Sequence, residues 1–302
     1  MHYGDHQVLK GVDLEVGAGE IFGFLGPNGA GKTTTIEILE GYRKRSSGEV
    51  EVLGSDPGQP SRGWRERIGL VLQECQLDPL LTVSEILELY SSFYRRPRDI
   101  GELIALVGLE GRENQRLGRL SGGQQRRADV ALALVGDPEL IFLDEPTTGF
   151  DPTARRDAWK MIKGLKAIGK TVLLTTHYME EAQALADTVA IIRGGEIVAR
   201  GTPDEIVGAG ARRATICFRE SGEATADAVR TVVGLPVHTD GGRLTIEAQD
   251  TQPTLLALLS WADRHQLALE ALEVRRPTLE DTFLELTGGE GEPAGGADER
   301  HA

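Results

Sequence analysis

The sequence predicts an α/β fold with a mostly parallel sheet, followed by a smaller α+β domain. Over residues 1–208, apolar runs of strand length alternate with segments of helical period, and four of those runs end in a polar group. Beyond the glycine-rich stretch at 208–210, strands and helices are expected in the order βαββαβα, typical of a two-layer α+β domain. We therefore expect one domain over 1–208, a second over 211–288, and a disordered tail over 289–302 that has nothing large and apolar to pack.

A glycine-rich loop follows the first apolar strand of the sheet, residues 21–25. Its sequence is Gly26-Pro27-Asn28-Gly29-Ala30-Gly31-Lys32-Thr33-Thr34, which fits the pattern G-x-x-x-x-G-K-[ST], and a helix is expected from Thr34 to Leu39. The glycines let backbone N–H groups turn toward an anion, Lys32 adds positive charge for outer phosphates, and the Thr33 hydroxyl can bind magnesium. An ordinary glycine-rich turn is the alternative, but the strand–loop–helix order favours phosphate binding.

The other elements of the first domain follow from turns, caps and periodicity. Short strands are expected over 12–16, where apolar and polar residues alternate, and over 46–54, between two turns. A capping box beginning at Thr82 starts a helical insertion over 83–118, and a second, Ser121 to Gln124, starts the next helix; together they form a helical subdomain over about 83–135. The remaining expected elements are strands 68–72, 140–143 and 172–174, a helix around 153–168, a hairpin over 189–199 and a short helix from Pro203.

Four apolar strands end in polar groups, which are the Gly26 loop, Gln73, Asp144-Glu145 and His177. Because ligands of open α/β sheets bind beyond the carboxyl ends of the strands, these groups are expected to form one site. A carboxylate directly after a buried strand is costly unless it is paired, so Asp144 is a candidate magnesium ligand. Glu145 faces the other way and is a candidate to polarise an attacking water. The alternatives are a capping aspartate, a solvated turn glutamate and a packed histidine.

The second capping box has two interpretations. Ser121 and Gln124 could simply start a helix. With Gly122 and Gly123 between them, the N–H groups at the positive end of the helix dipole stay uncovered, which is the arrangement of an anion site. On these residues alone both interpretations stay open.

Composition bears on the class of function. The 302-residue chain carries a formal net charge of −14 and a pI of about 5.0, which disfavours a general nucleic-acid binder, although solubility alone would also explain the acidity. No apolar run approaches the ~20 residues that cross a bilayer, and the polar start lacks the pattern of a signal peptide. We expect a cytoplasmic protein whose role at a membrane comes through a partner.

In their order along the chain, these motifs resemble those of the ABC-type ATPases. The resemblance covers residues 3 to about 205 and includes the phosphate loop, Gln73, the signature Leu120-Ser121-Gly122-Gly123-Gln124, Asp144-Glu145, Gly149-Phe150-Asp151 and His177. It implies a P-loop ABC-ATPase core, with an antiparallel β subdomain and a helical subdomain beside the mostly parallel sheet. Residues 277–284 are similar to the C-terminal segment of exporter ATPases of the daunorubicin-resistance type, so export of a drug, antibiotic or other hydrophobic compound is expected.

The resemblance also implies ligands and residue roles. ATP and Mg²⁺ are the expected cofactors, with Glu145, His177 and Gln73 acting in hydrolysis and Thr33, Gln73 and Asp144 at the metal. The residues expected to contact the nucleotide are Tyr3, Gly26, Asn28, Gly29, Gly31, Lys32, Thr33, Thr34, Ser121, Gly122, Gly123 and Gln124. Two departures from the family pattern are that only two residues precede Tyr3, the aromatic expected to stack on adenine, and that Phe150 stands where leucine is commoner.

A homodimer and a membrane permease are the partners that the resemblance implies. Two chains would meet head to tail, each ATP lying between one phosphate loop and the other chain's Ser121-Gly122-Gly123, while Gln73 and the insertion over 83–118 would face the permease at the inner face of the cell membrane. A helical subdomain that only packs is the alternative for that insertion. Two rival functions are a non-transport ABC ATPase that acts as a switch on ribosome or DNA, and a permease-associated regulator whose C-terminal domain binds a small ligand. A P-loop kinase is excluded by the signature.

Overall fold

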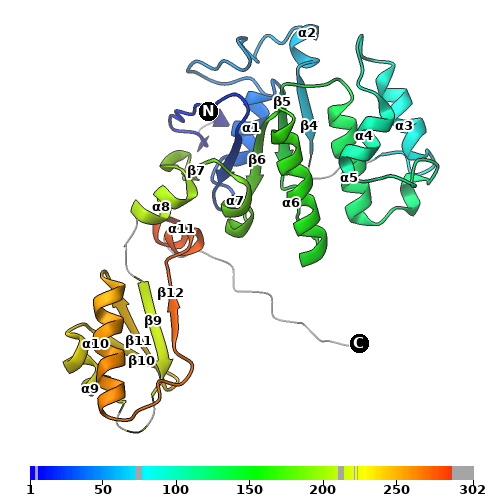
Figure 1. The fold of residues 1–302 in the computed structure, drawn as a ribbon. Helices are drawn as coiled ribbons and strands as arrows, with labels where there is room; N and C mark the ends of the chain where they lie inside the picture. The colour runs from blue at the N-terminus through cyan, green and yellow to red at the C-terminus, as the bar shows by residue number, and fades with distance from the viewer. Residues whose placement is uncertain (4–5, 73–76, 210–213, 221, 223, 288–302) are drawn as a thin grey trace, which may run out of the picture. The chain divides into compact units, whose positions relative to one another are not determined.

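The computed structural model describes residues 1–3, 6–72, 77–209, 214–220, 222 and 224–287. Within them the chain forms two compact units. One comprises Met1–Pro203 together with Leu286 and Thr287, and the other comprises Asp204–Glu285 (Figure 1). Each unit is described by itself.

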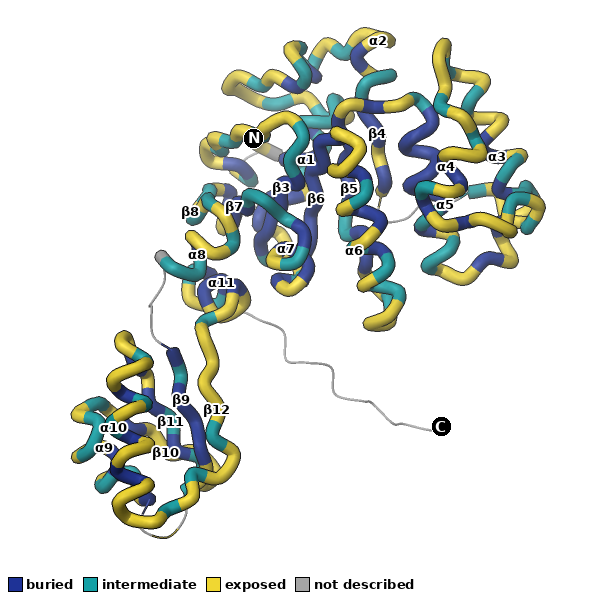
Figure 2. Tube along the Cα trace, viewed as in Figure 1, coloured by how far each residue is buried: buried dark blue, intermediate teal, exposed yellow. Residues whose placement is uncertain are grey.

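The first unit is built on a six-stranded sheet with the order β4-β5-β6-β3-β7-β8. Its strands are β3 (Ile21–Leu25), β4 (Ile68–Val71), β5 (Leu140–Asp144), β6 (Thr171–Thr176), β7 (Thr188–Arg193) and β8 (Glu196–Gly201). The first five in that order are parallel, and β8 pairs antiparallel with β7. β3 and β6 are buried along their whole length, as is usual for strands of a parallel sheet that is covered on both faces (Figure 2). The predicted α/β class with a mostly parallel sheet is confirmed.

Successive residues of these strands enter two different cores, because side chains alternate between the faces of a sheet. On β5, Ile141 and Leu143 join a core that also contains α3 to α6, whereas Phe142 packs in the second core with Phe22 and the indole of Trp64. The helices outside the helical subdomain are α1 (Lys32–Leu39), α2 (Arg62–Arg65), α6 (Pro152–Ala167) and α7 (Met179–Leu185).

The helical subdomain consists of three helices and a 3₁₀ turn, which are α3 (Val83–Ser91), α4 (Ile100–Val107), the turn Leu117–Arg119, and α5 (Gly122–Leu134). Both predicted capping boxes are present: the side chains of Thr82 and Ser121 accept from the N–H groups of Glu85 and Gln124, whose own side chains accept in return. The predicted break near Gly108 is also observed, since this glycine ends α4 in the left-handed conformation.

Two predicted strands are wrong. Residues 12–16 belong to no strand, although Val12, Leu14 and Val16 pack against the second core with exposed residues between them. Residues 46–54 contribute a single bridge, between Val52 and Ser55. In both segments the alternation of apolar residues reflects one-sided burial, and no neighbouring strand of the described chain supplies a hydrogen-bond ladder. The strands that do form near the start are β1 (His2–Tyr3) and β2 (His6–Gln7), an antiparallel pair.

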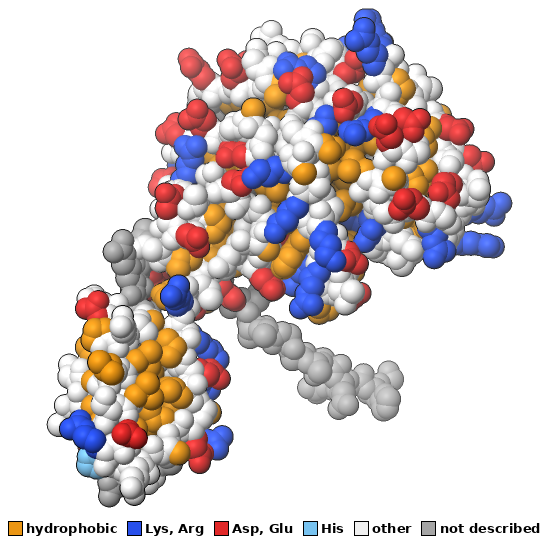
Figure 3. Space-filling model, viewed as in Figure 1, with side chains coloured by type: hydrophobic (Ala, Val, Ile, Leu, Met, Phe, Trp, Pro, Cys, Tyr) orange, Lys and Arg blue, Asp and Glu red, His pale blue; other side chains and the backbone are white. Residues whose placement is uncertain are grey.

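The second unit has an antiparallel sheet with the order β10-β11-β9-β12. Its elements are α8 (Pro203–Ala209), β9 (Ala214–Arg219), α9 (Ala226–Val233), β10 (Val237–Asp240), β11 (Arg243–Ala248), α10 (Thr251–Arg264), β12 (Glu273–Arg275) and α11 (Leu279–Thr287). The βαββαβα order from β9 to α11 is as predicted, and the sheet buries Ile216, Phe218 and Ile246. Apolar side chains remain on the outer surface of this unit, where Leu256 and Leu259 of α10 are exposed (Figure 3).

None of the helices in the described part of the chain is both long enough and apolar enough to cross a membrane.

Candidate active site

The glycine-rich loop lies between β3 and α1, at the carboxyl edge of the sheet. Gly29 and Gly31 both have positive φ, and a Cβ at Gly31 would lie only 2.5 Å from Leu9 Cδ2, so this turn requires glycine. Gly31 is also the N-cap of α1, and no side chain caps it. The loop therefore presents backbone N–H groups at the positive end of a helix, the arrangement that binds phosphate.

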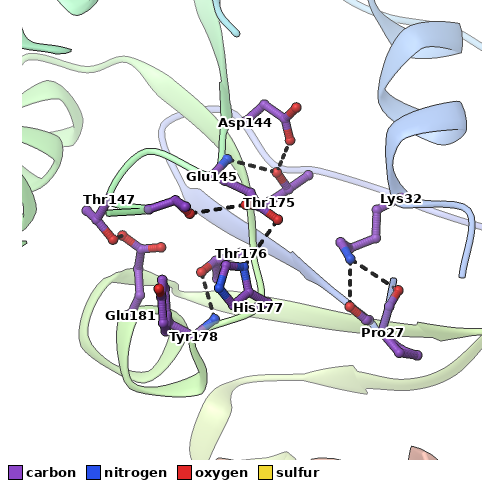
Figure 4. A network of polar contacts seen from close by, with 12 residues as sticks. Pro27, Lys32, Asp144, Glu145, Thr147, Thr175, Thr176, His177, Tyr178 and Glu181 are labelled. Atoms are coloured by element: carbon purple, nitrogen blue, oxygen red, sulfur yellow. Dashed lines mark hydrogen bonds and ion pairs between the residues drawn. The ribbon is translucent and has the colours of Figure 1, made fainter. Parts of the chain in front are cut away.

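Lys32 is buried inside this loop, with 8 % of its surface exposed. Its Nζ donates hydrogen bonds to the carbonyl oxygens of Gly26 (2.7 Å) and Pro27 (3.2 Å), as Figure 4 shows. Burial lowers the pKa of Lys32, and the nearby carboxylates of Glu145 and Asp144 act in the opposite direction. A cation is thus held between the loop and the acidic ends of the sheet.

Asp144 and Glu145 are fixed at the end of β5 by Thr175 of the neighbouring strand β6. The Thr175 hydroxyl donates to Asp144 Oδ1, while the Glu145 N–H donates to the Thr175 hydroxyl (3.1 Å) and carbonyl oxygen (3.2 Å) (Figure 4). Glu145 has a φ of 45°, which is unfavourable for a residue with a Cβ and turns the chain sharply after the strand. The two carboxylates therefore leave the strand end in different directions (Figure 4).

His177 follows the end of β6 and faces Glu145. Its Nδ1 lies 3.2 Å from Glu145 Oε1, and the other carboxylate oxygen of Glu145 accepts from the Thr148 hydroxyl at 3.1 Å. The ring of His177 packs against Tyr178, with centroids 4.0 Å apart. A carboxylate and an imidazole in contact, beside a phosphate loop, can orient a water molecule and transfer a proton.

Thr33 and Asp144 line the same cavity, which has a volume of about 830 Å³. A hydroxyl and a carboxylate are oxygen ligands of the kind that Mg²⁺ uses when phosphate oxygens and water complete its shell. No group of three or more His, Cys, Asp or Glu side chains with metal-binding geometry occurs in the described residues. The donor set therefore fits a magnesium ion that is held jointly with a phosphate.

The signature residues are not part of this polar network. Ser121 and Gln124 bond to each other at the start of α5, and Ser121 and Gly122 are exposed. A Cβ added at Gly122 would meet no atom within 4 Å. The N-terminus of α5 is thus an open, uncovered surface.

The other predicted residues can be placed only in part. Gln73 lies outside the described residues. Tyr3 lies in β1, but its side chain is not described. Asn28 is exposed in the phosphate loop, and Thr34 lies in the first turn of α1.

Several polar residues around the site were not anticipated from the sequence. Arg126 of α5 donates to the carbonyl oxygens of Leu72 and Asp144. Glu181 of α7 is fully buried and accepts hydrogen bonds from Thr147, in the turn after β5, and from Trp159 of α6. A charged residue at a core-facing helix position was the available sequence signal for both, but it does not identify the partner.

A phosphate loop with a buried lysine, next to a carboxylate pair and a histidine at the carboxyl edge of a parallel sheet, defines a P-loop protein that hydrolyses nucleoside triphosphates. Comparison with known proteins is more specific. Residues 9–148 match the sequence family described as ABC transporter, and residues 214–278 match the family described as the C-terminal domain of ABC transporter domain-containing proteins. The chain belongs to the ATP-binding proteins of the ABC transporter family.

Relatives over nearly the whole chain support this assignment. A daunorubicin resistance ATP-binding protein of Streptomyces coeruleorubidus is 38% identical, covering 95% of this chain and 93% of the relative. A Nod factor export ATP-binding protein of Ralstonia nicotianae is 38% identical (95% and 91% covered), and a linearmycin resistance ATP-binding protein of Bacillus subtilis is 36% identical (95% of each).

Solved structures agree with the fold of the first unit. A dimeric ATP-binding cassette in a post-hydrolysis state with ADP and Pi has a TM-score of 0.58 at 30% identity, covering 65% of this chain and 90% of that one. Another is cbiO1 of Clostridium perfringens, part of an ABC transporter complex, with a TM-score of 0.62 at 29% identity and 69% and 87% coverage. The predicted family, its resemblance to the daunorubicin-resistance group and its ATPase activity are confirmed.

Proposed function

We propose that this chain is the energising subunit of a bacterial exporter for a drug, an antibiotic or another hydrophobic compound. It hydrolyses ATP at the inner face of the cell membrane and drives a separate integral membrane permease. The relatives named for resistance or export support the class of transport. The observation that carries the ATPase part is the contact between Glu145 and His177 next to the phosphate loop.

In this proposal Lys32 and the loop hold the triphosphate, and Glu145 orients and deprotonates the attacking water. His177 holds the Glu145 carboxylate and contacts the terminal phosphate, while Gln73 contacts the metal or the water and Tyr3 the adenine. A bound Mg²⁺, held by Thr33 and Asp144, would neutralise charge that develops on the phosphates.

Two copies would complete the site head to tail. The start of α5 presents uncovered N–H groups on an exposed surface, and an anionic phosphate from a second copy's loop is the natural partner for such a helix end. The dimeric cassette among the structural relatives supports a dimer. We propose residues 1–208 as the nucleotide-binding domain and residues 211–288 as an accessory domain that supports the dimer.

The permease would dock in the cavity that Thr33 and Asp144 help to line. That cavity is lined by residues of α1, β4 and the helical subdomain, and its lining includes Tyr42, Leu72 and Tyr90, which are 81%, 47% and 37% exposed. Exposed apolar side chains around a groove fit an apolar segment of a partner protein. A permease segment there would lie close to the magnesium ligands, which couples docking to hydrolysis.

The test is the Glu145→Gln variant, which keeps the size of the side chain and removes the base. We expect ATP binding to be retained, turnover to fall about 10²- to 10⁴-fold and an ATP-bound dimer to accumulate, as measured by phosphate release, nucleotide titration and size-exclusion chromatography. Glu180→Gln is the control, because the Glu180 side chain is 76% exposed on α7. Unimpaired hydrolysis in Glu145→Gln would remove Glu145 as the base. Capture of ribosomes or DNA instead of a membrane protein would favour a non-transport switch.

A further inference from the structure

Glu181 is a buried carboxylate that lies beside the proposed catalytic residues without being one of them. It occupies the third position of α7, where a glutamate commonly turns back to cap its own helix. Here the side chain enters the interior instead and has no exposed surface. Its Oε1 accepts hydrogen bonds from the Thr147 hydroxyl (2.9 Å) and from the Trp159 indole (3.1 Å).

Burying the Glu181 carboxylate costs free energy that a side chain serving only to fill space would not incur. Burial raises the pKa of Glu181, although the nearby side chains of Thr176, Thr147 and Trp159 oppose the rise. Its second oxygen, Oε2, is buried and has no hydrogen-bond partner in the described part of the chain. An apolar side chain of similar volume would avoid both costs, so stability alone does not explain a carboxylate here.

The hydrogen bond between Thr147 and Glu181 joins the chain segments that follow β5 and β6. β5 and β6 are adjacent parallel strands, with Asp144 opposite Thr175. Glu145 and Thr147 follow the end of β5, whereas His177 and Glu181 follow the end of β6. The hydrogen bond from Thr147 to Glu181 therefore links the two segments across the strand pair.

The same two segments carry the 3.2 Å contact between Glu145 and His177 (Figure 4). Thr147 follows Glu145 by two positions along one segment, and Glu181 follows His177 by four positions along the other. The two contacts thus close a short ring, in which the buried Thr147–Glu181 bond restricts how far Glu145 and His177 can separate. Indole donation from Trp159 adds α6 to this ring and fixes the position of Oε1.

We propose that Glu181 is a positioning residue for ATP hydrolysis, which sets the separation of Glu145 and His177 through its hydrogen bond with Thr147. The inference rests on the proposed roles of Glu145 and His177. It assigns to Glu181 the geometry of the hydrolytic step and no contact with the nucleotide.

The test compares four variants of the full chain by kcat, by KM for ATP and by thermal unfolding. Thr147→Val removes only the hydroxyl donor, and Glu181→Met removes the carboxylate acceptor. We expect both variants to lower kcat by about ten- to a hundredfold and to leave KM for ATP within about twofold, because misplaced catalytic groups slow the reaction without weakening nucleotide binding. Thr147→Ser and Glu181→Gln keep the donor and the acceptor, so we expect kcat within about threefold of the unmodified chain. Glu180→Gln, its exposed neighbour, is the matched control.

Wild-type kcat in folded Thr147→Val and Glu181→Met would overturn this inference and leave the proposed function intact. A raised KM at unchanged kcat would also overturn it, because the bond would then serve binding. If Glu181→Met fails to fold, the Thr147 pair decides the question alone, since valine and threonine are nearly isosteric. Absence of ATP hydrolysis by the unmodified chain would instead overturn the proposed function itself.

Discussion

The stability of the first unit should depend on pH through Glu40, which lies at the end of α1 and lines the proposed docking cavity. Its pKa is raised from 4.5 to about 7, chiefly by burial and further by the charges of Asp144 and Glu37. A raised pKa means that the folded chain binds this proton more tightly than the unfolded chain does. The resulting stabilisation is complete below pH 4.5 and is lost as the pH rises to about 7.

The size of this effect follows from the two pKa values. At about 1.4 kcal/mol for each tenfold change in proton affinity, a change from 4.5 to about 7 corresponds to roughly 3 kcal/mol. Because Glu40 is only partly buried, solvent screening should reduce this to about 1–2 kcal/mol. Glu40→Gln is neutral at every pH and should avoid the loss.

We therefore expect Glu40→Gln to unfold at a higher denaturant concentration than the unmodified chain at pH 8, and most of that difference to disappear at pH 5. Urea unfolding at several pH values, without nucleotide or added metal, measures it directly. Glu88→Gln on α3 is the matched control for the change of charge, because Glu88 is exposed. The same difference between Glu40→Gln and the unmodified chain at pH 5 and pH 8 would refute the electrostatic reasoning.

Two further predictions concern the fold around the site. Gly31→Ala places a Cβ 2.5 Å from Leu9 Cδ2 at a φ of 107°, a strain of about 1–3 kcal/mol, so ATP affinity in a nucleotide titration should fall about 5- to 150-fold; unchanged affinity would mean that the loop tolerates another shape. Trp64→Phe removes the 2.8 Å indole donor from the Val52 carbonyl, which keeps a 3.2 Å hydrogen bond from the Ser55 N–H, so the loss in urea unfolding should be about 0.5–1.5 kcal/mol. No measurable loss would mean that the indole hydrogen bond does not stabilise the fold.

Features encoded within a few residues could be predicted from the sequence. The two capping boxes need only a hydroxyl and a Glu or Gln three positions later, so the starts of α3 and α5 were found correctly. The phosphate loop is likewise contiguous, and two of its glycines, Gly29 and Gly31, have the positive φ values that its turns require. The strand expected over 12–16 failed because alternation of apolar residues reports burial on one side and says nothing about a pairing neighbour.

Parts of the site that depend on strand order could not be predicted in the same way. That Asp144 and His177 follow strands was visible in the sequence, but the adjacency of β5 and β6 was not. The hydroxyl of Thr175 on Asp144 and the bond from Thr147 to Glu181 both arise from that adjacency. A buried polar residue shows in the sequence as an interruption of an apolar face, whereas its partner is decided by tertiary packing.

Arg126 ties α5 to the ends of two neighbouring strands of the sheet. The helix begins at the signature corner, and five residues later this buried guanidinium holds the carbonyl oxygens of Leu72, just beyond β4, and Asp144, the last residue of β5. Each such charge-assisted bond is worth about 1.5–3 kcal/mol. A partner that displaces the N-terminus of α5 must therefore either break both hydrogen bonds or move the ends of β4 and β5 as well. The end of β5 carries Asp144. A displacement at the N-terminus of α5 would therefore reach Asp144 without any change in the helix itself.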